Sequence, residues 1–178
     1  MSFYSEYSQK VLKATVDDIN KQQGIAFVVF TGDNINNPKE ENLKTFLKIV
    51  KNLKVPYYFA IGDNDVYKAN GLSKVRYYEL IKNSNLLHFR YKPNYKFSKK
   101  GFMFLIVDGA KEVIPGSVGY YRAETIDWVQ KELSRNKRKD VVIFQHFPVV
   151  YPEGSESSVK THKTYKVEAY QDAIENYH

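Results

Sequence analysis

The chain has 178 residues, with 27 Lys and Arg against 20 Asp and Glu, which gives a formal charge of +7. This length predicts a single domain, and an aromatic content of 15% excludes a disordered chain. Because the chain contains no cysteine, disulfides, thiolate metal sites and cysteine nucleophiles are excluded as well.

The positive charge is scattered along the chain. Its densest run, residues 135–139, follows a predicted helix, and cations there complement the helix dipole. We therefore expect no nucleic-acid partner. A nucleic-acid-binding protein is kept as a further hypothesis that rests on the charge alone. No apolar run is long enough to span a membrane, and the N-terminal residues do not form a signal peptide. The default expectation for the compartment is the cytoplasm.

The first half of the chain alternates helices with apolar strands. Amphipathic spacing predicts helices over residues 5–21, 39–53 and 73–83. Residues 25–30 and 55–61 are continuous apolar runs of strand length. Runs without alternation predict strands that are buried on both faces, as in a parallel sheet covered by helices.

The middle of the chain has a different pattern. Apolar stretches at 86–91, 95–98 and 102–107 are separated by short turn sequences, which predicts antiparallel strands. Residues 113–121 contain two glycines and a proline and are predicted to form a long loop.

The last third returns to alternation of helix and strand. We predict a helix over residues 123–135, a last buried strand over 141–144, a polar loop over 152–166 and a helix over 167–177. This alternation along the chain predicts an α/β fold.

Polar side chains follow three of the apolar strands. Asp33 comes after the first strand and Asp63 after the second, each preceded by glycine, and His146 comes after the last. If the three strands run parallel, these side chains converge at one edge of a sheet. Taken singly, each has a simpler interpretation as a turn or structural residue. Together, two carboxylates and an imidazole suit Mn²⁺, Fe or Zn²⁺.

Three of these segments resemble motifs of the calcineurin-like metallophosphoesterases: GDNIN at 32–36, AIGDND at 60–65 and FQHFP at 144–148. The resemblance implies a four-layer α/β/β/α sandwich with mixed sheets and a centre of two divalent ions (Mn, Fe or Zn). It also implies a small phosphoester substrate, whose phosphorus is attacked by water that the metals activate.

The same resemblance assigns roles to individual residues. Asp33 matches the carboxylate that bridges the two metals, and His146 matches a ligand of the second metal. Asp63 occupies the position of a ligand asparagine. Asn64 occupies the position of the catalytic histidine, and its amide cannot supply a proton near neutral pH.

Two further positions match polar residues that orient their neighbours without binding metal. These are Asn36, three residues after Asp33, and Asp65, the last acid of the second motif.

Two motifs of the family are absent: an opening Asp-x-His and a closing Gly-His-x-His. We therefore expect residues 1–178 to form one calcineurin-like domain that is incomplete at both ends and binds one ion or none. The predicted function is hydrolysis of phosphate mono- or diesters by a dinuclear centre. The alternative is a non-catalytic, degenerate domain that binds a ligand or a partner protein.

Overall fold

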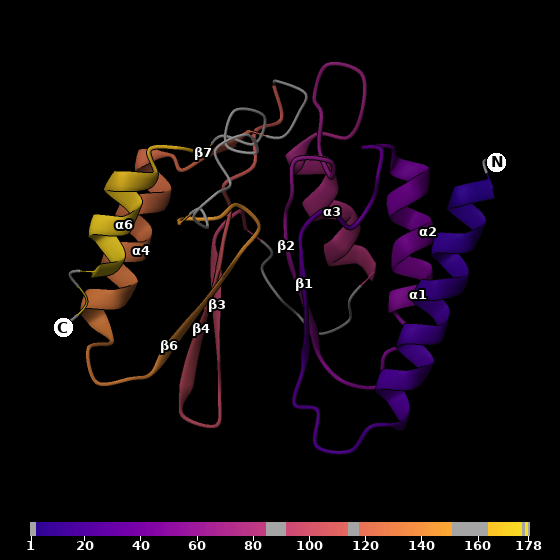
Figure 1. Ribbon diagram of the computed structural model, residues 1–178, viewed down its shortest axis with the longest axis horizontal. Helices are drawn as coiled ribbons and strands as arrows, with labels where there is room; N and C mark the ends of the chain where they lie inside the picture. The colour runs from indigo at the N-terminus through magenta and orange to yellow at the C-terminus, as the bar shows by residue number, and fades with distance from the viewer. Residues whose placement is uncertain (1–2, 85–91, 114–117, 151–163, 176, 178) are drawn as a thin grey trace.

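The computed structural model describes residues 3–84, 92–113, 118–150, 164–175 and 177. Within these residues the chain is a mixed α/β structure with five helices and three small sheets (Figure 1). The helices are α1 (Phe3–Lys21), α2 (Glu40–Val50), α3 (Lys74–Ser84), α4 (Ala123–Arg135) and α6 (Val167–Glu175). The strands are β1 (Val28–Thr31), β2 (Tyr57–Ala60), β3 (Tyr95–Lys99), β4 (Phe102–Val107), β5 (Gly119–Tyr120), β6 (Val141–Gln145) and β7 (Thr164–Tyr165). All five predicted helices are present, each within one turn of its predicted bounds.

The first sheet consists of β1 and β2. The two strands run parallel, with Val28 opposite Tyr57 and Thr31 opposite Ala60. Helices α1, α2 and α3 lie on the outer side of this sheet (Figure 1). Helix α2 is amphipathic, because its apolar residues recur every three or four positions. Its buried side chains are Leu43, Phe46, Leu47, Ile49 and Val50.

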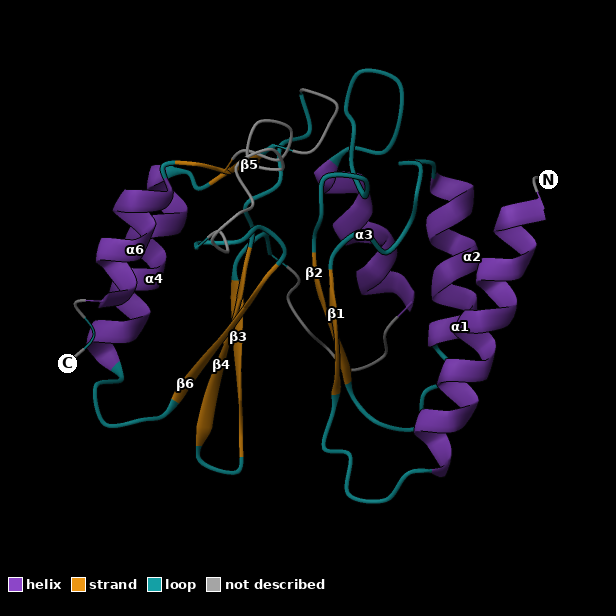
Figure 2. Cartoon of the chain, viewed as in Figure 1, coloured by secondary structure: helices purple, strands orange, loops and turns teal. Residues whose placement is uncertain are grey.

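The second sheet has the strand order β3-β4-β6. Strands β3 and β4 form the predicted antiparallel hairpin, and its turn places Lys100 and Gly101 at positive φ angles of 49° and 88°. Two consecutive positive φ angles are typical of tight hairpin turns, whose twist matches that of the strands. Strand β6 joins β4 in parallel, with Val107 opposite Gln145. Helices α4 and α6 lie on the outer side of this sheet (Figure 2).

Aromatic rings fill the space between the two sheets. The ring of Phe27 meets those of Phe97 and Phe104 edge-on, at centroid distances of 5.1 and 4.8 Å, and Tyr58 stacks on Phe97 at 3.6 Å. Such aromatic pairs stabilise a core beyond the area that they bury. The order of elements across the molecule is therefore helices, sheet, sheet, helices (Figure 2).

Two sequence predictions about burial were wrong. Strand β1 and strand β6 are only partly buried, and Val142 of β6 is 37% exposed. In the described part of the chain each of these strands is paired along one edge only, to β2 and to β4. Among the strands that the structure describes, β2 alone is fully buried along its length. A continuous apolar run indicates that a strand packs on a core. It does not show whether neighbouring strands cover both edges of that strand and so complete its burial.

The third sheet was not predicted. Strands β5 and β7 pair in parallel, within segments that the sequence indicated were loops. Each strand has two residues, which is too short for any periodicity to be visible. Strand β6 is consequently not the last strand. The predicted strand at 86–91 lies outside the described residues. No described helix has the length and apolar character that crossing a membrane requires.

Candidate metal centre

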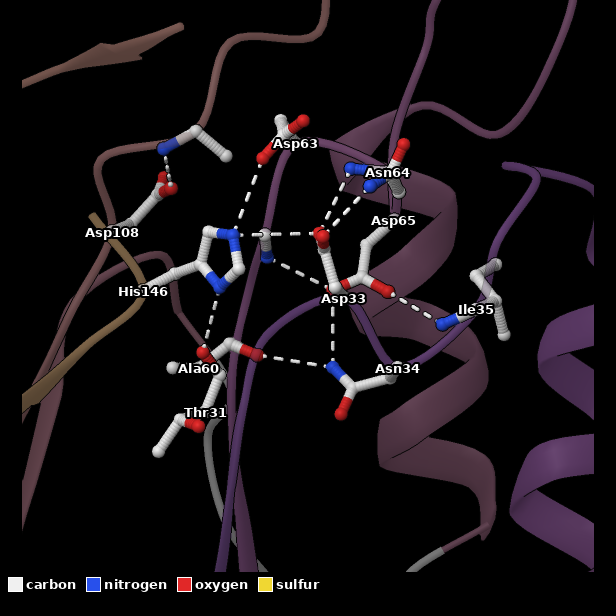
Figure 3. Close-up of polar contacts among 12 residues, drawn as sticks. Thr31, Asp33, Asn34, Ile35, Ala60, Asp63, Asn64, Asp65, Asp108 and His146 are labelled. Atoms are coloured by element: carbon white, nitrogen blue, oxygen red, sulfur yellow. Dashed lines mark hydrogen bonds and ion pairs between the residues drawn. The ribbon is translucent and has the colours of Figure 1, made fainter. Parts of the chain in front are cut away.

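Three strand ends bring acidic and imidazole side chains together. Asp33 follows β1, Asp63 follows β2 and His146 follows β6, and one ligand atom from each lies within 4.8 Å of the others. Figure 3 shows the three side chains turned toward one another. The sequence placed them at the edge of a single sheet. The structure corrects this: β6 belongs to the second sheet, so the cluster spans the junction between two sheets.

Two glycines allow this close approach. Gly32 has a φ angle of 99°, and a Cβ atom there would collide with the ring of His146. A Cβ atom at Gly62 would collide with the carboxyl group of Asp33. Asp33 itself has a left-handed φ angle of 52°, which is uncommon for a residue with a side chain. The strand ends are thus shaped to bring the ligand atoms together.

Hydrogen bonding fixes which ring nitrogen of His146 faces the carboxylates. Its Nδ1 lies 3.0 Å from the carbonyl oxygen of Thr31, which can only accept, so Nδ1 carries the proton and donates. Its Nε2 lies 3.2 Å from Oδ1 of Asp63 and 3.5 Å from Oδ1 of Asp33. In the neutral ring, a lone pair on Nε2 therefore points at two carboxylates. A cation between them removes this repulsion, and a donor on the far ring nitrogen is typical of histidines that bind metal.

Asn64 contacts the cluster through Asp33. Its backbone N–H donates to Oδ1 of Asp33 at 3.1 Å, and its side-chain amide donates to Oδ2 at 2.7 Å. Asn64 is exposed, so the side chain is accessible to a ligand as well. The amide therefore orients Asp33.

Asp65 lies behind the cluster and is fully buried. Its carboxylate accepts hydrogen bonds from the backbone N–H groups of Ile35 and Gly62, at 3.1 and 2.9 Å. Burial raises the pKa of the Asp65 carboxyl to about 7, against the opposing effect of these donors. The side chain therefore ties the loop after β1 to the loop after β2.

Asn34 is a residue of this network that sequence reasoning missed. Its amide nitrogen lies 3.0 Å from Oδ2 of Asp65, 3.0 Å from the hydroxyl of Tyr77 and 3.2 Å from the carbonyl of Ala60. Asn36, to which the family pattern pointed, is exposed. In the sequence, Asn34 is marked only by its position directly after Asp33. In the structure, its side chain contacts Asp65 and Tyr77.

The donor set fits a divalent cation. Carboxylate oxygens and an imidazole nitrogen are the ligands that Mn²⁺, Fe and Zn²⁺ take in proteins. The side chain of Asp63 is 9% exposed and that of His146 is 23% exposed, whereas Asp33 is 36% exposed and faces solvent. An ion here would be held from the protein side and open toward solvent on the side of Asp33.

A second charged cluster lies close to this centre. Asp108 follows β4, and its carboxylate pairs with the ammonium group of Lys74 at the start of α3. Both side chains are buried, at 7% and 9% exposure. Lys74 also donates to the carbonyl of Ala110 at 2.6 Å, and the backbone N–H of Ala110 donates to Asp108 at 2.9 Å. Figure 3 shows the Asp108 carboxylate joined by a dashed line to a backbone N–H and to none of the three ligand side chains.

Comparison with known proteins assigns this chain to a family. The family model described as calcineurin-like phosphoesterase matches residues 6–171. The chain belongs to the calcineurin-like phosphoesterase family. That family comprises metal-dependent phosphoesterase hydrolases, and membership implies the α/β/β/α sandwich. The resemblance stated from three short motifs is thereby confirmed.

A curated relative supports the same assignment. The chain is 29% identical over 124 residues to a protein of Arcobacter nitrofigilis named probable glycerophosphodiester phosphodiesterase GpdQ. The aligned region covers 69% of this chain and 42% of that protein. The chain therefore spans less than half the length of this phosphodiesterase homologue.

Proposed function

We propose that the chain hydrolyses phosphate mono- or diesters with a divalent metal centre built on Asp33, Asp63 and His146. The observation that carries this proposal is the approach of three ligand atoms to within 4.8 Å at the ends of strands from two sheets. Family membership supports a phosphoester substrate. The name of the Arcobacter relative makes glycerophosphodiesters the first natural substrate class to test.

A divalent ion in this position supplies Lewis-acid polarisation of the phosphoryl group and activation of water. The chain's own residues prepare the site for it. Asp33 and Asp63 supply negative charge, and the hydrogen bond from His146 to Thr31 holds Nε2 toward them. The described residues offer three ligands, enough for one ion. Asp33, the least buried of the three, would hold the ion on its solvent side, and both of its oxygens also accept hydrogen bonds from Asn64.

Asn64 determines how the site can assist the departure of the substrate's leaving group. Its amide donates a hydrogen bond and orients a phosphate oxygen, but it does not transfer a proton. We therefore expect esters of acidic alcohols, such as nitrophenol, to be hydrolysed far better than alkyl esters. Replacing Asn64 with histidine should raise hydrolysis of an alkyl ester by about 100-fold, the contribution typical of a general acid.

The test measures metal content and turnover on the same samples. The 178-residue chain is loaded with Mn²⁺ or Zn²⁺, its metal is counted by mass spectrometry, and hydrolysis of bis(4-nitrophenyl) phosphate and 4-nitrophenyl phosphate is followed. Loaded protein should turn over at least one ester, and His146→Ala should bind less metal and lose activity. Asp127→Asn, on the exposed face of α4, is the matched control. Turnover that persists in chelator, or that equals wild type in His146→Ala, contradicts the proposal.

A second candidate function is a non-catalytic domain that binds a phosphorylated ligand or a partner protein. Asn64 is the observation that favours it, because a site without a proton donor binds phosphate without cleaving alkyl esters. Metal binding without turnover of either nitrophenyl ester, in wild type and in Asn64→His, would select this candidate.

A further inference from the structure

The small third sheet lies beside the metal centre. Strands β5 and β7 pair with Gly119 opposite Thr164 and Tyr120 opposite Tyr165. They lie at the end of the molecule toward which β1, β2 and β6 run (Figures 1 and 2). This is the end at which the three ligand side chains meet.

Two lysines gather around the tyrosines of this sheet. The Nζ atom of Lys111 lies 4.6 Å from the ring centroid of Tyr120 and 5.3 Å from that of Tyr165. The Nζ atom of Lys166 lies 5.4 Å from the centroid of Tyr120. We call these four residues the lysine–tyrosine cluster. Tyr165 is 44% exposed and Lys166 is exposed, so that the cluster opens to solvent.

Ion pairing among the described residues does not account for this arrangement. Two ammonium groups share the Tyr120 ring, and among the described residues neither forms an ion pair with a carboxylate. Lys166 has a left-handed φ angle of 57° and precedes α6, where the helix dipole disfavours a cation. Two positive charges thus lie close together, one of them where the helix dipole is unfavourable.

A short chain of contacts links the cluster to the metal centre. The backbone N–H of Tyr120 donates to the carbonyl of Gly109 at 2.8 Å. Its neighbour Gly119 lies so close to Phe147 that a Cβ atom would collide with that ring. Phe147 directly follows His146, and their ring centroids are 4.9 Å apart. The cluster is therefore fixed relative to the ligand residue His146 through packed backbone and one aromatic ring.

We propose that Lys111 and Lys166 form a subsite for a second anionic group of the phosphoester, a phosphate or carboxylate remote from the bond that is cleaved. This rests on the proposed function. Hydrogen bonds from ammonium groups to an oxyanion are among the stronger ones in proteins. Both side chains are long, and the contacts recorded for their ammonium groups within the described residues are ring faces, from which they can turn to an anion. The subsite selects esters that carry two negative groups.

The first test needs no metal and no turnover. In chelator, inorganic phosphate is titrated into the 178-residue chain while backbone amide signals are followed by NMR. Residues 119–120 and 165–166 should shift and saturate. The double variant Lys111→Gln/Lys166→Gln should bind phosphate there about tenfold more weakly, since charge-assisted hydrogen bonds are lost.

The control variant Lys48→Gln/Lys131→Gln removes the same charge from exposed positions on α2 and α4 and should bind phosphate like wild type. An absence of saturable shifts at residues 119–120 and 165–166, or equal affinity in both double variants, overturns the subsite whether or not the protein is an enzyme.

The second test assigns the subsite to the substrate. Two 4-nitrophenyl phosphodiesters are compared, one with a neutral alkyl group and one whose alkyl group ends in a phosphate. Lys111→Gln/Lys166→Gln should raise KM for the second ester about tenfold and leave kcat and the neutral ester unchanged. Equal effects on both esters overturn the assignment to substrate. If no ester is hydrolysed at all, the proposed function fails while the phosphate titration still decides the subsite.

Discussion

The metal centre and the Lys74–Asp108 cluster both place acidic side chains after strands, but they differ in their net charge. In both, an acidic side chain lies within three residues of the end of a strand. Asp108 is buried with a lysine ammonium group against it, and its second oxygen accepts a backbone N–H. Asp33 and Asp63 instead meet each other and a histidine nitrogen, with no lysine or arginine in an ion pair with them in the described chain. A cluster that is neutral within itself supports the fold, whereas a cluster left with excess negative charge is suited to bind a cation.

Removing the cation from the neutral cluster should have the largest effect. Lys74→Met leaves the Asp108 carboxylate buried without its partner, and we expect a loss of about 3–5 kcal/mol in the free energy of unfolding. Urea denaturation measures it. Lys74→Met/Asp108→Asn removes the stranded charge and should recover part of the loss. A loss below about 1 kcal/mol in the single variant would contradict the contrast between the clusters.

Adding a cation to the metal centre should come next. Mn²⁺ at 100 times its dissociation constant should stabilise the chain by about 2.7 kcal/mol, because it binds only the folded state. Thermal melts with and without chelator measure this shift. His146→Ala should lose most of the shift and fold normally in chelator. An identical Mn²⁺ shift in His146→Ala would place the ion elsewhere.

Neutralising an acid of the metal centre should stabilise the fold, whereas removing Lys74 from the neutral cluster destabilises it. In chelator, Asp63→Asn should raise the free energy of unfolding by about 1 kcal/mol, since it relieves repulsion from Asp33 and from the Nε2 lone pair. The same variant should weaken Mn²⁺ binding. Denaturation in chelator and calorimetric titration measure the two effects, and destabilisation in chelator would show that the site is not strained by its charge.

Loosening the hydrogen bonds behind the metal centre should have a smaller effect. Tyr77→Phe removes the hydroxyl group next to Asn34 and should cost about 1 kcal/mol of stability. We expect Mn²⁺ affinity to fall as well, by up to about tenfold, as when residues that orient ligands are changed. Tyr177→Phe removes a hydroxyl that bonds to the carbonyl of Asn136, away from the site, and is the matched control. Equal Mn²⁺ affinity in wild type and Tyr77→Phe would separate Asn34 from the metal site.

An exposed ion pair should give the smallest effect. Hydrogen bonds from Arg76, and then from Lys44, lower the pKa of Glu40 to about 2. Because the folded pKa lies below the ordinary value of 4.5, any stabilisation by Glu40 is complete above pH 4.5 and is lost as the pH falls toward 2. Glu40→Gln should therefore lower the melting temperature slightly at pH 7 and less at pH 3. A pH-independent difference would show that the ionisation of Glu40 is not its cause.

The sequence predicted the helices and the strand ends well, because both leave local signals. The α4 segment has apolar residues at helical spacing over its whole length, and its predicted bounds are those observed. Asp33 and Asp63 were found because a Gly-Asp pair follows a long apolar run. Their roles, and that of His146, as metal ligands stay predictions that the proposed experiments test.

Other features have no local signal. Strand β6 was expected in one sheet with β1 and β2. Which strand it pairs with depends on contacts between sheets, such as those of Phe27, that no short segment encodes. Asn34 and Asn36 are both polar and follow the same aspartate. Which of them turns inward depends on Asp65 and Tyr77, which are far along the chain. Asp108 also follows an apolar strand, although without a preceding glycine, and its pairing with Lys74 depends on a residue far along the chain.

The origin of the ligands along the chain has a mechanical consequence. Residues 3–84 contribute Asp33 and Asp63 together with the first sheet, and residues 92–177 contribute His146 with the second. Lys74 and Asp108 already tie these two halves together. A bound ion would connect the two halves a second time, close to the Lys74–Asp108 ion pair. Any slippage of one half against the other would therefore open the coordination shell before it disturbed either half internally.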